Sequence, residues 1–203
     1  MVRSLLRVAA LGAAAFALPM PASAQHFSDS YQFLHAIRES DGTKVMEMLN
    51  EPGTQIANTR DSATGETALH IVSRRSDIVY MRFLLQHNGN PNITDNEGNT
   101  PMMIAVQQGW IEGVQTLIRY QGDVNRANNR GETPLIRAVQ LRNLPLVRAL
   151  LDAHANPDQA DVIAGRSARD YALADNRAPA IRRLMEEAPR VQTNPNIMGP
   201  QLR

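Results

Sequence analysis

Apolar residues recur along the chain at the spacing of short amphipathic helices. Two segments place four apolar residues on one helical face, at the same offsets and 33 residues apart: Ile111, Val114, Leu117 and Ile118, then Leu144, Val147, Leu150 and Leu151. This periodicity predicts a helix in each segment. These helices, and an earlier equivalent, are expected to end before the turn-forming stretches 88–92, 121–125 and 154–158, with Asn88, Gln121 and His154 as left-handed C-caps.

A shorter helix is expected in front of each of these. Thr100-Pro101 and Thr133-Pro134 are typical helix starts. A threonine hydroxyl can accept from an unpaired N–H of the first turn, and proline at the first helical position loses nothing by lacking its own N–H. The sequence predicts first helices of about two turns that stop near Ser76, Gly109, Arg142 and Asn176.

This helix pair repeats at a fixed interval. Glycines mark the intervals of 33, 33 and 34 residues, and apolar pairs close each unit: Gly65, Gly98, Gly131 and Gly165, with Leu84-Leu85, Leu117-Ile118, Leu150-Leu151 and Leu184-Met185. A weaker copy begins with FLHAI at 33–37. Because one helix pair cannot bury its apolar face alone, the units are expected to stack. We predict a domain over 25–188 with units at about 27–60, 61–94, 95–127, 128–160 and 161–188.

The repeated motifs resemble the ankyrin repeat. The resemblance rests on GETALH, GNTPM and GETPL, followed by LLQHNGNPN, LIRYQGDVN and LLDAHANPD. It covers roughly residues 27–188 and implies an all-α solenoid of about five helix-turn-helix units with hairpin loops. It also implies that His70, and His35 in the weaker copy, tie neighbouring loops by hydrogen bonds. Met103, Ile136 and Asp170 replace this histidine in the other units.

Both ends of the chain differ from the repeats. Arg3 and Arg7, the apolar run 8–18 and ASA at 22–24 indicate a secretory signal peptide over 1–24, with cleavage expected after Ala24. The apolar run is about half of the ~20 residues that span a bilayer, which favours cleavage over a membrane anchor. We therefore expect a periplasmic protein of a Gram-negative bacterium, with onward secretion as the alternative. Residues 189–203 hold three prolines and no periodicity, which predicts a flexible tail.

Composition narrows the chemistry. The chain has 203 residues, no cysteine and few aromatic residues, so disulfides and cysteine nucleophiles are excluded and a helical core is favoured. Without the signal peptide, 19 basic residues face 20 acidic ones, which argues against nucleic acid as a partner. No phosphate-binding loop, zinc-protease motif or serine-hydrolase motif is present. The stretch 95–100 resembles a calcium loop, but Ile93 stands at its first ligand position. We expect no metal and no cofactor.

A few residue groups permit other readings. His26 would be the second residue of the mature chain and could bind copper with the amino terminus, although nothing nearby supports this. Five methionines suggest either core packing, which we favour, or a copper or oxidation sensor: Met46, Met48, Met81, Met102 and Met103. Four polar residues are expected to give the last unit a wettable outer face: Arg169, Asp170, Arg182 and Arg183.

In ankyrin proteins the usual partner surface is the concave groove formed by hairpin tips and first helices, and the resemblance implies the same surface here. The candidates neither cap helices nor pack in the expected core: Glu66, Arg74, Arg75, Asn96, Glu97, Asn99, Gln107, Gln108, Asn129, Arg130, Glu132, Gln140, Leu141, Val162, Ile163 and Arg166. Val162 and Ile163 either contact a partner or pack against the last unit. Trp110 either covers the stack, which we favour, or anchors a partner.

These features predict a monomeric, non-enzymatic module that binds another protein in its groove. Two alternatives remain open. One is an accessory factor that protects or matures an envelope enzyme under oxidative or metal stress, and the other is a secreted effector directed at a host. A hydrolase with an unfamiliar site is a more distant alternative.

Overall fold

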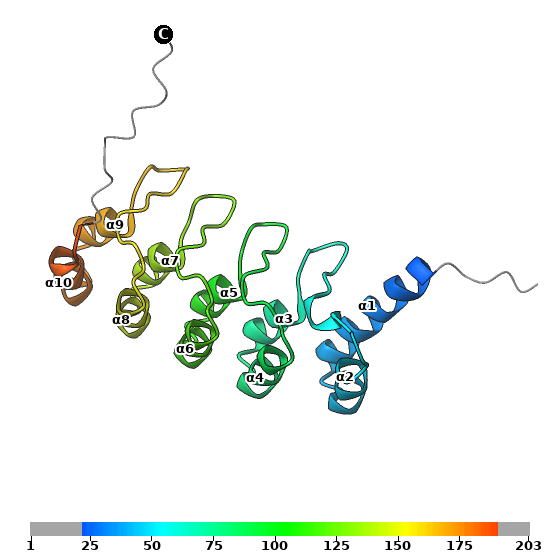
Figure 1. The fold of residues 1–203 in the computed structure, drawn as a ribbon. Coiled ribbons are helices and arrows are strands. Elements are labelled where there is room, and N and C mark those ends of the chain that lie inside the picture. The colour runs from blue at the N-terminus through cyan, green and yellow to red at the C-terminus, as the bar shows by residue number, and fades with distance from the viewer. Residues whose placement is uncertain (1–21, 191–203) are drawn as a thin grey trace, which may run out of the picture.

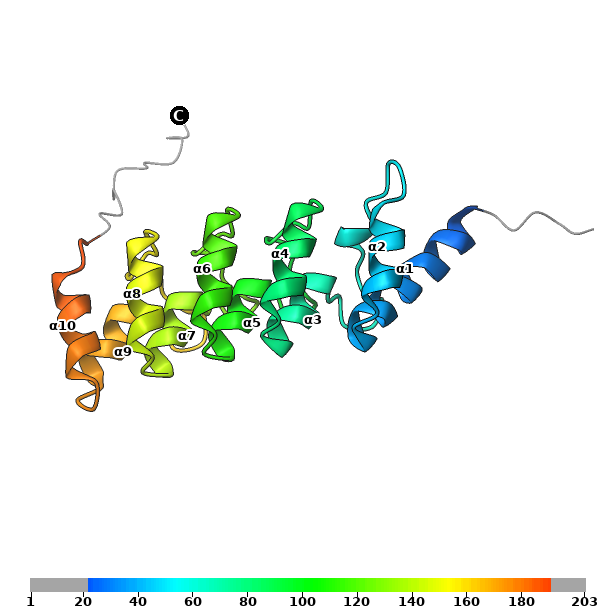
Figure 2. The same cartoon turned by 90° about the horizontal axis from the view of Figure 1, so that it is seen from below.

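The computed structural model describes residues 22–190 and shows, over that range, a single row of stacked helix pairs (Figure 1). The elements follow in chain order: α1 (Ala22–Glu39), α2 (Gly42–Leu49), η1 (Ile56–Asn58), α3 (Ala68–Arg75), α4 (Ile78–Gln86), α5 (Pro101–Gln107), α6 (Ile111–Arg119), α7 (Pro134–Gln140), α8 (Leu144–Asp152), α9 (Ala168–Ala174) and α10 (Pro179–Glu187). The hairpin loops project on one side of the row and the second helices α4, α6 and α8 lie side by side on the other (Figures 1 and 2). The predicted all-α solenoid is confirmed.

The helices start where the caps predict. The hydroxyls of Thr100 and Thr133 accept from the N–H groups of Met103 and Ile136, each at 3.2 Å, and a proline follows each threonine. Such a bond satisfies one of the N–H groups that the first turn leaves without a helical partner. The repeated Thr-Pro pair therefore fixes the first residue of α5 and of α7.

Left-handed residues end the helices. Asn88, Gln121 and His154 have φ of 62°, 62° and 63°, as predicted for the ends of the second helices. Ser76, Gly109 and Arg142, after the first helices, are also left-handed. The last first helix differs, because α9 ends at Ala174 on an extended Asp175. After α3, α5 and α7 the left-handed residue turns the chain so that the second helix folds back against the first.

One apolar core runs through the row. The apolar pairs of the second helices supply it, and Leu84, Leu117, Leu150 and Met185 are fully buried. Each first helix from α3 to α9 packs on the next, and α6 packs on both α4 and α8. Short helices of seven to nine residues are marginal in isolation, so this stacking is what stabilises them.

An asparagine ladder joins successive units beside the second helices. Asn92 accepts from the N–H of Asp123 at 2.7 Å and donates to the carbonyl of Gln121 at 3.1 Å. Asn58 and Asn125 make the equivalent pair of bonds one unit earlier and one unit later. The acceptors are the carbonyls of the left-handed residues, so each amide satisfies a helix end of the following unit.

The first unit departs from the repeat. The prediction that His35 ties loops together is wrong, because α1 is a long helix and His35 lies exposed within it, 5.9 Å from the ring of Tyr31. Met46 was expected in the core but is half exposed on α2, whereas Met48, Met81, Met102 and Met103 are buried. Met46 and Val45 of α2 border a hollow of about 410 Å³ that Val79 and Phe83 of α4 close on the other side.

The last unit also differs from the prediction. Arg169 was expected on a wettable outer face, but it is buried, where it pairs with Asp158 and donates to the carbonyls of Met185, Ala188 and Pro189. Asp170 and Arg183 are exposed and Arg182 is partly so, as predicted. Most of the expected signal peptide (residues 1–21), and residues 191–203 of the expected tail, lie outside the described residues. Within the described range no helix is both long and apolar enough to cross a membrane.

Candidate protein-binding groove

Each hairpin tip is built around one short acidic or amide side chain. Asp61, Asp95, Asn128 and Asp161 each accept at least two backbone N–H groups from the following residues of the tip. The hydrogen bond from Arg38 lowers the pKa of Asp61 to about 2, and the hydroxyl of Tyr171 lowers the pKa of Asp161. Asp61 and Asp161 are therefore ionised at neutral pH.

The tips are bonded to one another. Asn96 donates its backbone N–H and its side-chain amide to the carbonyls of Thr64 and Ala63, at 3.0 and 2.9 Å. Asn129 repeats this with the carbonyls of Glu97 and Asn96, both at 3.0 Å. Both asparagines were predicted as free groove positions, but their amides hold neighbouring tips in register.

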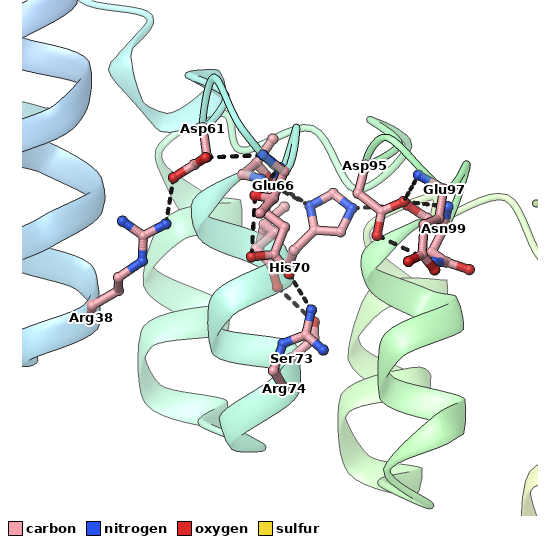
Figure 3. Close-up of polar contacts among 12 residues, drawn as sticks. Arg38, Asp61, Glu66, His70, Ser73, Arg74, Asp95, Glu97 and Asn99 are labelled. Carbon is pink, nitrogen blue, oxygen red and sulfur yellow. Dashed lines mark hydrogen bonds and ion pairs between the residues drawn. The ribbon is translucent and has the colours of Figure 1, made fainter.

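The residues that follow the glycines are more buried than predicted. Asn99 is 3% exposed and Glu132 is 8% exposed. Asn99 accepts from His70 through its carbonyl at 2.9 Å and from Asn128 through its side chain at 3.2 Å. His70 in turn accepts from the N–H of Thr67 at 3.1 Å, so the predicted tie between loops is confirmed at His70 (Figure 3). Asn99 and Glu132 thus lie buried beneath the hairpin tips.

At the N-terminal end of the groove the expected arginine pair is already engaged. Arg74 pairs with Glu66, as Figure 3 shows. Arg75 donates to the carbonyl of Ile37 and to Ser40 at the end of α1, and it lies 5.4 Å from the ring of Tyr80. Arg75 therefore bonds the first unit to the second, and only Arg74 faces solvent with more than half of its side chain.

Toward the C-terminal end the candidate residues are open. Val162 and Ile163 are 74% and 73% exposed, so they do not pack against the last unit. Several other candidates are also exposed: Glu97, Gln108, Arg130, Gln140 and Leu141. Gln107 is partly exposed, and Arg166 is partly exposed where it lies 4.4 Å from the ring of Tyr171. Trp110 packs on the core over Gly113, which agrees with its predicted role of covering the stack.

Two adjacent hollows mark this end of the groove. One, of about 280 Å³, is lined by Arg130, Glu132, Arg137, Gln140, Asp161, Ile163 and Tyr171. The other, of about 310 Å³, shares Gln140 and Tyr171 and adds, among others, Arg142, Arg166, Asp175 and Arg177. The sequence reasoning missed Arg137 and Tyr171. A signal was present, because both occupy the motif position that Ile71 and Ile104 fill with buried apolar side chains.

The groove offers no obvious site for a metal. Among the described residues, no group of three or more histidine, aspartate or glutamate side chains lies close enough to hold an ion. The carboxylates that line the hollows are paired with arginine, tyrosine or backbone N–H groups. The chemistry that this surface presents is therefore guanidinium, amide and exposed aliphatic groups.

Comparison with known proteins agrees with this architecture. A family model described as ankyrin repeats in three copies matches residues 33–128, and a single ankyrin repeat matches 130–162. The chain belongs to the ankyrin repeat family. The fifth unit, α9 and α10, lies beyond these matches and continues the stack in the structure.

Curated relatives share single stretches of this ankyrin protein. It is 38% identical over 53 residues to the nuclear factor NF-kappa-B p110 subunit of Drosophila melanogaster, which is 26% of this chain and 6% of that protein. It is also 38% identical over 63 residues to the putative ankyrin repeat protein FPV031 of fowlpox virus (31% and 18%) and over 68 residues to the neurogenic locus notch homolog protein 1 of Homo sapiens (34% and 3%). The chain spans less than a fifth of each.

Proposed function

We propose that this ankyrin protein is a non-enzymatic module that holds another protein in the C-terminal half of its groove. The observation that carries the proposal is the exposure of Val162 and Ile163, at 74% and 73%, beside two open hollows. Exposed aliphatic side chains on a rigid surface are stabilised by a partner that removes them from water. The polar positions nearer the N-terminus support this choice, since the protein's own hydrogen bonds occupy most of them.

Photocrosslinking in the native cell tests this proposal. A photoreactive residue at Ile163 is expected to form one reproducible adduct with a partner protein. The matched control is the same residue at Arg148, which is exposed on α8 on the opposite side of the row. Equal labelling at both positions, or no adduct at Ile163 when the protein is expressed at its native level, would contradict the proposal.

We further propose that the protein works in the periplasm as a monomer after removal of residues 1–24. Export and cleavage are supported by the apolar run 8–18, which follows Arg3 and Arg7, and by the ASA site at 22–24. Cleavage after Ala24 would remove the first three residues of α1, which begins at Ala22, and leave the packing of Phe33 and Ile37 intact. N-terminal sequencing of the protein from a periplasmic fraction should return Gln25; an intact Met1 would exclude this processing.

A further inference from the structure

Two arginines at the C-terminal end of the groove lack a strong carboxylate partner. Arg137 donates to the Gln140 side chain at 3.3 Å and lies 3.9 Å from Glu132, and its buried Nε has no hydrogen-bond partner. Arg166 donates to the carbonyl of Asp170 at 3.1 Å and stacks on Tyr171. Both guanidinium groups therefore have more donors than the chain supplies acceptors; because the Nε of Arg137 is buried, a ligand would reach this arginine through its terminal nitrogens.

These arginines are specific to this end of the row. At the position of Arg137 the second and third units have Ile71 and Ile104, both buried. At the position of Arg166, the second and fourth units have Glu66 and Glu132. The third unit has Asn99 at the position of Arg166, so in the second to fifth units each of these two positions is cationic once, beside the two hollows.

The carboxylates of this region are already committed. Arg142 and Arg177 both bond Asp175, and the pKa of Asp175 is lowered to about 2 by the backbone N–H of Arg177 and by Arg142. Asp161 is held by Tyr171 and by tip N–H groups, and Glu132 lies between Arg130 and Arg137. Five arginines and three carboxylates line the two hollows, so a formal charge of +2 is left at neutral pH.

An aliphatic surface adjoins this positive charge. Ile163 lines the same hollow as Arg130 and Arg137, and Val162 stands next to it on the tip. A ligand that satisfies the guanidinium groups would therefore bring its neighbouring atoms onto an exposed apolar surface. The complementary ligand combines a carboxylate with an adjacent aliphatic side chain.

We propose that the partner presents an acidic peptide segment, in which aspartate or glutamate side chains bond Arg137 in one hollow and Arg166 in the adjoining hollow, and a neighbouring aliphatic residue packs on Ile163. This inference rests on the proposed protein-binding function and specifies its ligand. Arginine suits the role, because its planar guanidinium group can hold a carboxylate through two parallel hydrogen bonds. The 20 arginines and single lysine of the chain fit this form of recognition.

Selection from a phage-displayed library of random 12-residue peptides tests the inference on residues 25–203. Enriched peptides are expected to contain Asp or Glu next to Leu, Ile or Val. Binding of a synthetic enriched peptide, measured by fluorescence anisotropy, should weaken at least tenfold in R137Q/R166Q and on changing its acid to the amide. R148Q makes the same chemical change on the opposite side of the row and should bind like the wild type.

A charge swap separates recognition from folding. R166E should bind the original peptide poorly and should gain affinity for the peptide whose acid is replaced by arginine. If enriched peptides compete with crosslinking at Ile163 but lack acids, or bind R137Q/R166Q unchanged, the inference is overturned while the proposed function stands. If crosslinking at Ile163 captures a protein whose attached segment has no acidic residue, the inference also fails. Absence of both peptide binding and crosslinking removes the proposed function itself.

Discussion

At the scale of single residues, the same side-chain chemistry serves the same bond in unit after unit. Asp61, Asp95, Asn128 and Asp161 all close a hairpin tip through a side-chain oxygen. A role repeated in this way identifies a structural residue, because every unit needs it. A residue whose chemistry differs from that at the equivalent position of other units, as Arg137 differs from Ile71 and Ile104, indicates a role that those units do not share.

His70 makes stability depend on pH. Burial lowers the pKa of His70 below its usual value of 6.5, and protonation would break the bond that its Nδ1 accepts from Thr67. The unfolded chain then binds this proton more readily than the folded chain does. The contribution of neutral His70 to the free energy of unfolding is therefore fully present above about pH 6.5 and is lost as the pH falls below that value. Urea unfolding between pH 7.5 and 5.5 should show this loss, and H70Q, which cannot titrate, should show a smaller one. Equal pH dependence in both would contradict the role.

Gly98 and Gly165 allow a matched comparison. Both have positive φ, 81° and 62°, at equivalent positions. An added Cβ at Gly98 would lie 2.4 Å from Oδ1 and 2.6 Å from the backbone nitrogen of Asn129, whereas at Gly165 it would meet nothing within 4 Å. Gly165→Ala should cost about 1 kcal/mol of backbone strain, and Gly98→Ala at least about 1 kcal/mol more. Equal losses in urea unfolding would show that the tips are not in close contact.

At the scale of helices, the sequence predicts what is local and misses what lies between units. The Thr-Pro starts and the left-handed ends at Asn88, Gln121 and His154 were predictable, because one turn of chain determines them. The burial of Asn99 and the bonds of Asn96 and Asn129 were not, since the partners in these bonds stand about 30 residues earlier, in the preceding unit. The exposure of His35 was missed for a related reason: the weak first copy hides the length of α1.

Leu117 tests the stacking of α6. Its side chain is fully buried in the core that α6 shares with its neighbours, so Leu117→Ala should reduce the free energy of unfolding by ~2–5 kcal/mol through lost contact and a residual cavity. Gln107, partly exposed at the end of α5, is the control, and Gln107→Ala should change it by no more than ~0.5 kcal/mol. Chemical denaturation gives both values. Small effects at both sites would contradict the assigned core.

At the scale of the whole molecule, hydrogen bonds join successive units along two sides of the row. Asn96 and Asn129 bond the tips, and the asparagine ladder bonds the bases of the second helices. The core runs between these two rows of bonds, so each central unit is bonded to its neighbours on both sides of the core. Rigidity of this kind benefits a binding surface, because little order must be gained when a partner docks. The last tip of the row bonds the one before it through the N–H of Val162 and the carbonyl of Arg130 at 3.0 Å, and the side chains of Val162 and Ile163 are exposed.

The last unit of the row must be stabilised in a different way, because no further unit packs on it. Arg169 provides this stabilisation, because its buried guanidinium group joins Asp158, before α9, to the carbonyls at the end of α10. Arg169→Met keeps the apolar stem but removes the guanidinium donors that join these groups, which should cost about 3–5 kcal/mol. In a row where each unit contacts only its neighbours, the loss should stay local.

Hydrogen exchange read by mass spectrometry distinguishes this local loss from general destabilisation. In Arg169→Met the amides of α9 and α10 should exchange faster, whereas those of α5 and α6 should keep their wild-type protection. Arg182→Met is the control, since Arg182 makes a solvent-exposed pair with Glu186 and such pairs contribute less than about 1 kcal/mol. Faster exchange throughout the row would mean that the array unfolds as one cooperative block, and Arg169 would then stabilise the whole molecule rather than its end.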